Sequence, residues 1–137
     1  MLQRDYFIRL IEEFSAAISR FLTKKEDDLK RDKELKDLYK QYVGEYEDLR
    51  NLSVDELLTY AKEQWDEEER IDKINMVAEL LYAEGSYKGQ PLRQILLEKA
   101  YALFDYVEAN DSTFSIDRRQ KMEAMRQELG NKLSQID

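Results

Sequence analysis

The sequence predicts an all-α fold, because apolar residues recur at helical spacing along the chain and because signals for strands and turns are few. Of the 137 residues, 42% are hydrophobic and 38% are charged, which is typical of slim helices that bury one apolar stripe and expose a broad polar face. Four glycines and one proline provide too few turns for a multi-stranded sheet. We therefore expect a single domain over residues 1–137, built from five to six amphipathic helices arranged as consecutive antiparallel hairpins.

The N-terminal segment 1–23 is expected to form an amphipathic helix that runs from Asp5, its N-cap, to Thr23. Apolar residues recur on one face of this helix: Phe7, Leu10, Phe14, Ile18 and Phe21. Three interpretations of this stripe are open. It packs against the other helices, or it forms a docking or dimerisation face, or it lies on a membrane surface. The membrane is the third choice, because the opposite face mixes acidic with basic residues, whereas an anionic bilayer favours basic ones. We take these five residues, together with Trp65, as candidate partner-binding residues.

The segment 24–37 is almost entirely charged, and it predicts either an exposed helix with spaced opposite charges or a connector. Residues 38–137 are expected to form the helical hairpins. Within them, Gly44 is expected to end the next helix, since glycine readily adopts the left-handed conformation found at helix ends. Ser53 and Glu56 have the spacing of a capping box, which predicts that another helix begins there.

Three further helices are expected after residue 65. The acidic run 66–69 favours the start of the first, and Gly85 is expected to end it. The second covers residues 92–107, and Ser115 is expected to begin the third. The apolar residues of this last helix are expected to line its inner face: Ile116, Met122, Met125, Leu129 and Leu133. Its basic residues are expected to face the solvent: Arg118, Arg119, Lys121 and Arg126.

Between Ile74 and Val107, two expected helices are joined by a short turn, with small Ala78 followed by Gly85 and Tyr87. This pattern resembles a tetratricopeptide repeat, a helical hairpin that stacks into longer arrays. The resemblance implies that the alanine lets two helices approach, that the glycine permits the turn and that the tyrosine wedges the hairpin. It therefore implies tetratricopeptide-like packing in the C-terminal half of the chain.

The whole chain carries a second likeness. Its Asp5-Tyr6 opening and its segment 113–118, with the sequence Thr-Phe-Ser-Ile-Asp-Arg, are similar to those of an uncharacterised family of short bacterial all-helical proteins. This resemblance implies a bacterial protein made of helices. It implies no particular activity, since we know none for that family.

The chain lacks the side chains of the commonest active sites. It has no histidine and no cysteine, which excludes Ser-His-Asp and Cys-His pairs as well as the usual zinc ligands. Its glycines are not followed by the Gly-Lys-Ser/Thr of a phosphate loop, and its acidic run 66–70 lacks the glycine of a calcium loop. We predict a protein that is not an enzyme and has no cofactor and no metal site. The remaining alternative is a small-ligand binder, or an enzyme that uses carboxylates alone.

Charge is distributed unevenly along the chain. The segment 45–72 contains eleven acidic and three basic residues, so it accounts for the whole net charge of −8. Such a surface repels phosphate, so we expect no nucleic acid partner and a preference for basic partners. No apolar run is long enough to span a membrane or to form a signal peptide, so we expect a cytoplasmic location.

These features together predict a non-enzymatic protein-interaction module, an adaptor or scaffold that binds a partner helix or peptide. Phe7, Phe14 and Phe21 are the expected anchors if the first helix projects from the domain. The alternative is a self-associating structural protein that pairs through the same helix, since short heptad patterns also suit helix pairing.

Overall fold

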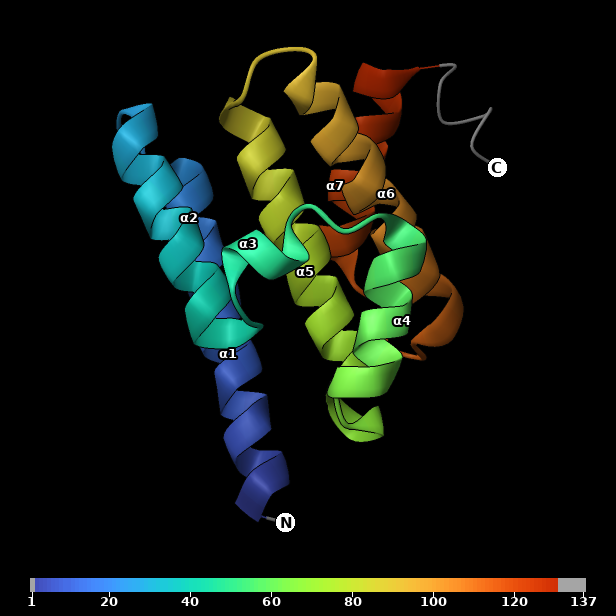
Figure 1. Ribbon diagram of the computed structural model, residues 1–137. Coiled ribbons are helices and arrows are strands. Elements are labelled where there is room, and N and C mark those ends of the chain that lie inside the picture. The colour runs from blue at the N-terminus through green and yellow to red at the C-terminus, as the bar shows by residue number, and fades with distance from the viewer. Residues whose placement is uncertain (1, 131–137) are drawn as a thin grey trace.

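The computed structural model describes residues 2–130, which form seven helices and no strand (Figure 1). In chain order they are α1 (Leu2–Thr23), α2 (Asp28–Tyr42), α3 (Tyr46–Leu49), α4 (Val54–Gln64), α5 (Glu67–Tyr87), α6 (Leu92–Asn110) and α7 (Ile116–Leu129). The predicted all-α class is confirmed for this part of the chain. The helices exceed the expected five to six because the short α3 forms between Gly44 and Ser53, where no separate helix was predicted. None of the helices in residues 2–130 is long and apolar enough to cross a membrane.

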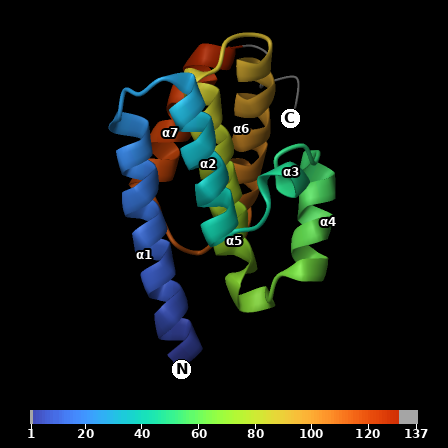
Figure 2. The same cartoon turned by 60° about the vertical axis from the view of Figure 1, so that its left-hand side comes forward.

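Helix α5 lies at the centre of the molecule. Figures 1 and 2 show α1, α2, α4 and α6 packed around it, with α6 antiparallel to α5 and α7 antiparallel to α6. Because neighbours cover it on several sides, α5 has a long set of buried residues: Ile74, Met76, Val77, Ala78, Glu79, Leu80, Leu81, Ala83, Glu84 and Gly85. The expectation of one buried stripe per helix does not hold for α5, since one stripe cannot face four neighbours.

Helix α1 begins earlier than predicted. It starts at Leu2, so Asp5 lies inside the helix and is not its N-cap. The Asp5 carboxylate still belongs to the first turn, where negative charge interacts favourably with the helix dipole. The predicted end at Thr23 is confirmed, and the Thr23 hydroxyl donates to the backbone oxygen of Ser19 at 3.1 Å, within the last turn.

The charged segment after α1 is mostly helix. Residues 24–27 connect α1 to α2, and the carboxylate of Asp27 caps α2 by accepting a hydrogen bond from the backbone N–H of Lys30 at 2.9 Å. Helix α2 runs antiparallel to α1 (Figure 2) and buries Leu35, Leu38, Tyr39 and Tyr42. Of the two interpretations of residues 24–37, the structure therefore supports a helix over most of the segment.

Gly85 lies within α5, which continues to Tyr87, so the predicted helix end at Gly85 is wrong. The glycine is required for a different reason. A Cβ atom at this position would lie 2.8 Å from Cδ2 and 3.0 Å from Cγ of Leu97 on the facing helix α6. The missing side chain thus allows α5 and α6 to approach closely. Local sequence does not distinguish a glycine that ends a helix from one that makes room for a neighbouring helix.

Three predicted helix boundaries depend on local chemistry and are confirmed. At the start of α4, the Ser53 N–H donates to the Glu56 carboxylate at 2.8 Å, and the Glu56 N–H donates to the Ser53 hydroxyl at 3.1 Å. Gly44 follows the end of α2 with a φ of 150°, a backbone conformation that favours glycine. Ser115 caps α7 by accepting a hydrogen bond from the Arg118 N–H at 3.1 Å.

The faces of α7 differ from the prediction at three positions. Ile116, which was expected to be buried, is 63% exposed. Arg118 and Lys121 were expected to face the solvent. Instead Arg118 is buried and donates to the Glu108 carboxylate at 2.9 Å. Lys121 is largely buried and forms an ion pair with Glu79 of α5. Long basic side chains can bury their stems when a carboxylate receives the charged end. The predicted burial is confirmed for Met122, Met125 and Leu129, whereas Leu133 lies outside the described residues.

A buried ion network attaches the α3 region to the centre of the molecule. Glu84 of α5 is 1% exposed and accepts hydrogen bonds from the Arg50 guanidinium at 2.8 and 3.1 Å and from the Tyr46 hydroxyl at 3.0 Å. Lys99 of α6 donates to the backbone oxygens of Arg50 and Leu52 at 2.6 and 3.0 Å. These bonds join α3 and the following connection to α5 and α6, and so fix the place where α4 begins.

Candidate partner-binding site

The predicted binding stripe of α1 lies in the core. Four of its five residues are at most 3% exposed: Phe7, Phe14, Ile18 and Phe21. The fifth, Leu10, is partly buried and packs against the core. Rings from neighbouring helices contact the stripe, with Phe14 edge-on to Tyr42 at 5.2 Å between centroids and Phe21 at 5.9 Å from Tyr87. In the fold, the stripe therefore packs against the other helices. Binding of a partner through this stripe stays a prediction, and it would require α1 to separate from the core.

Trp65, the sixth predicted binding residue, is also buried. It directly follows α4, is 7% exposed and packs edge-on against the ring of Tyr60 at 5.6 Å. The Lys73 ammonium lies 5.7 Å from the Trp65 ring centroid. Tyr60 is only partly buried and reaches the surface, so it connects the buried indole with the outer side of α4.

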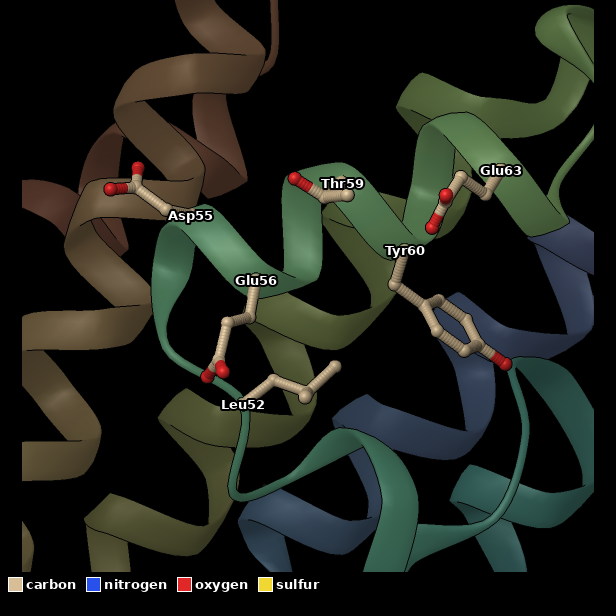
Figure 3. Close-up of a pocket in the computed structure, with 6 residues that line it drawn as sticks. All are labelled: Leu52, Asp55, Glu56, Thr59, Tyr60 and Glu63. Atoms are coloured by element: carbon tan, nitrogen blue, oxygen red, sulfur yellow. The ribbon is translucent and has the colours of Figure 1, made fainter.

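A hollow of about 390 Å³ lies on the outer side of α4 and of the connection that precedes it (Figure 3). We call it the α4 hollow, and its lining consists of Leu52, Asp55, Glu56, Thr59, Tyr60 and Glu63. Leu52 and Tyr60 are partly buried and supply its apolar surface, whereas the other four side chains are exposed. Figure 3 shows Asp55 and Glu63 at the two ends of this row, so that carboxylates flank the apolar pair.

The surface around the α4 hollow is strongly acidic. Of the eleven acidic residues in 45–72, nine are exposed. The bases of this segment neutralise few of them, because Arg50 is bound by buried Glu84 and Arg70 donates to backbone oxygens. Lys62 is the exposed base of the segment. The outer face of α4 therefore attracts cations.

Hydrogen bonds at both ends of α4 hold the hollow in shape. At the N-terminal end, the Ser53 backbone N–H donates to the Glu56 carboxylate, and the Ser53 hydroxyl accepts from the Glu56 N–H. Hydrogen bonding to Ser53 lowers the pKa of the Glu56 carboxyl. The Lys99 ammonium fixes the Leu52 backbone oxygen at 3.0 Å. At the C-terminal end, Arg70 donates to three backbone oxygens at 3.0 to 3.3 Å. A surface that is already ordered loses less conformational entropy on binding.

Sequence reasoning missed the α4 hollow as a site. The available signal was the acidic segment 45–72, which predicts basic partners, but residue spacing does not show that Leu52 and Tyr60 are only partly covered. Within the part of the chain that the structure describes, no group of three acidic side chains is placed to hold a metal ion. The arrangement suits binding, because carboxylates attract cations and the apolar pair accepts aliphatic side chains.

Comparison with known proteins adds no relative to this description. No protein-family model matches the chain. No curated protein matches it, and no solved structure matches it. The tetratricopeptide-like and bacterial resemblances of the sequence therefore stay predictions, and a function has to be inferred from the residues of this chain and their geometry.

Proposed function

We propose that this protein is a non-enzymatic interaction module, an adaptor or scaffold, that binds a basic segment of a partner protein in the α4 hollow. The observation that carries the proposal is the placement of exposed carboxylates around the apolar pair Leu52 and Tyr60. Such a surface complements a helix or peptide that presents lysine or arginine beside aliphatic side chains.

Charge and apolar contact contribute differently to this binding. Exposed ion pairs contribute about 0.2–1 kcal/mol each and are weakened by salt, so the carboxylates raise the association rate and select the partner's charge. Contact with Leu52 and with the Tyr60 ring supplies the part that salt does not weaken. Tyrosine is well suited to this role, because it offers a large rigid surface and is common among binding anchors.

The other partner classes have less support. Nucleic acid would bring its phosphates against nine exposed carboxylates of the segment 45–72. Self-association through the first helix would require the buried side chains of α1 to leave the core. A partner that approaches the α4 hollow needs no such rearrangement.

We further propose tetratricopeptide-like packing of the C-terminal half, a cytoplasmic location and a bacterial origin. The antiparallel α5–α6 hairpin, with its close approach at Gly85, supports the first of these. The absence of cysteine suits a reducing compartment and so supports the second. The third depends on the resemblance of the sequence alone.

The binding test uses Trp65, the single tryptophan of the chain, as a reporter, because its ring contacts Tyr60 of the α4 hollow. The probe is a synthetic amphipathic helix with a leucine stripe flanked by lysines, and the same peptide with glutamates in place of lysines is its control. We expect the lysine peptide to change Trp65 emission, with an affinity that falls as salt is added, and the glutamate peptide to leave the emission unchanged.

A charge reversal locates the site. Asp55 and Glu63 are exposed and form no ion pair or hydrogen bond among the described residues, so we expect Asp55→Lys with Glu63→Lys to keep the fold, which urea unfolding checks. Exchanging two attractive for two repulsive contacts predicts about tenfold weaker binding of the lysine peptide. The matched control, Glu12→Lys with Glu26→Lys, changes the net charge equally on α1 and the α1–α2 connection, and it should keep most of the affinity. Equal losses in both variants would show non-specific attraction and would refute the site.

A further inference from the structure

A second cavity, of about 420 Å³, opens where α1 and α7 flank α5. Figure 2 shows α1 and α7 on the same side of α5. We call this cavity the α1–α5–α7 cleft. Its lining is mostly polar, with hydroxyl groups from α1 and from the N-cap of α7, and with charged groups from α5 and α7. Ile18 and Leu22 of α1 add an aliphatic wall.

An unbalanced ion cluster lies in this cleft. Lys121 of α7 donates to both carboxylate oxygens of Glu79 on α5, at 2.6 and 2.9 Å, and Glu79 is 7% exposed. The same ammonium donates to Asp117 at 3.0 Å. An ammonium has three N–H donors, so these bonds use all the donors of Lys121. Within residues 2–130 no other charged side chain lines the cleft, so two carboxylates share one cation.

The same face of α5 carries an acceptor without a donor. Asn75 lies one helical turn before Glu79 and also lines the cleft. Its Oδ1 atom is buried and has no hydrogen-bond partner among the residues that the structure describes. A buried acceptor in this state is unfavourable, so rotation of the Asn75 amide toward a donor in the cleft would stabilise it. The hydroxyls of Ser15 and Ser19, which are exposed, offer further acceptors at the rim.

We propose that the α1–α5–α7 cleft is a binding site for a small aliphatic amine. Its ammonium group would donate to Asp117 and, once the Asn75 side chain rotates toward it, to Oδ1 of Asn75, and its alkyl chain would contact Ile18 and Leu22. The excess carboxylate favours a donor with positive charge, whereas the saturated Lys121 leaves no free cation among the described residues of the cleft to balance an anion. The volume of the cleft is within the range of roughly 300–1,000 Å³ found for small-molecule sites.

The protonation of the cluster agrees with this assignment. Burial raises the pKa of Glu79 above its ordinary value, and Lys121 offsets only part of that effect. Burial alone would lower the pKa of Lys121, but the carboxylates of Glu79 and Asp117 raise it overall, so the ammonium stays charged. A second cation in the cleft would favour the ionised form of Glu79, as the first does.

The test uses the full chain and putrescine, a short diamine, as the probe. Butanediol, a neutral molecule of similar length, and succinate, an anion, are the comparison ligands. The readouts are the NMR resonance of the Asn75 side-chain amide and the heat of binding. We expect putrescine to shift this resonance saturably and the two comparison ligands to leave it unchanged, because only the amine supplies a charged donor.

Three variants test whether putrescine binds in the α1–α5–α7 cleft. Asp117→Asn removes the excess carboxylate from an exposed side chain and should weaken putrescine binding about tenfold. Ser19→Tyr fills the rim from α1 and should abolish binding. Ala16→Tyr is the matched control, since Ala16 is exposed on α1 but does not line the cleft, and it should leave binding unchanged. Urea unfolding confirms that each variant keeps the fold.

Three outcomes would overturn the assignment: no saturable shift with putrescine at millimolar concentration, equal binding of butanediol, or undiminished binding to Ser19→Tyr. The site is separate from the α4 hollow. The Asp55→Lys, Glu63→Lys variant should therefore bind putrescine as the wild type does, and the two proposals can fail independently.

Discussion

Replacing Gly85 with alanine tests whether a close contact explains this glycine. The added Cβ would lie 2.8 Å from Cδ2 of Leu97, and Leu97 is 2% exposed, so its side chain has no open space to enter. Overpacking of this kind costs about 1–3 kcal/mol, whereas alanine in place of glycine inside a helix contributes about 1 kcal/mol. We therefore expect Gly85→Ala to lower the free energy of unfolding by about 1 kcal/mol.

A double-mutant cycle with Leu97→Ala isolates the contact. Truncation of this buried leucine alone should cost about 2–5 kcal/mol. In the Leu97→Ala background the clashing atoms are absent, so Gly85→Ala should stabilise the protein by about 1 kcal/mol through helix propensity. The interaction energy between the two positions is therefore expected to be about 2 kcal/mol, within the range measured for residues in contact.

Urea unfolding followed by Trp65 fluorescence measures the four proteins of this cycle. Gly89→Ala is the control, because a Cβ at Gly89 would have no heavy atom within 4 Å, and we expect no loss of stability from it. If Gly85→Ala stabilised the protein with Leu97 in place, the contact between α5 and α6 would not be the reason for this glycine.

Three further substitutions test the core, the ion network and the pH dependence. Phe14→Ala should cost about 3–5 kcal/mol in the same urea measurement, because Phe14 is 3% exposed; a wild-type midpoint would contradict its place in the core. Glu84→Gln should also cost about 3–5 kcal/mol, because it leaves Arg50 without its buried carboxylate, and a loss below about 1 kcal/mol would show that the pair behaves as an exposed one. The pKa of Glu128 lies below its ordinary value of 4.5, chiefly because Arg93 donates two hydrogen bonds to it, so this pair stabilises the fold above that pH and loses its effect as the pH falls through the lowered pKa. Melting temperatures of wild type and Glu128→Gln should thus differ at neutral pH and converge in acid, and a difference that is independent of pH would contradict the assignment.

The helix boundaries could be predicted from the sequence wherever interactions between neighbouring residues determine them. The capping box of Ser53 and Glu56 and the helix end at Gly44 depend on local features, and both lie at the predicted positions. For the candidate site, only the sign of its charge could be predicted, from the acidic segment 45–72. Its position depends on Arg50, which is held by a glutamate 34 residues away in the chain. No local pattern reports such a bond.

The sequence by itself determined that the described chain is helical and that its negative charge is concentrated near α4, because helix propensity, capping and charge are properties of residues close together in the chain. Only the tertiary structure decided that the α1 stripe is covered, that Gly85 makes room for Leu97, and that Glu79 meets Lys121. The physical reason is that periodicity shows which face of a helix is apolar but not which helix will cover it. Burial and ion pairing depend on that choice.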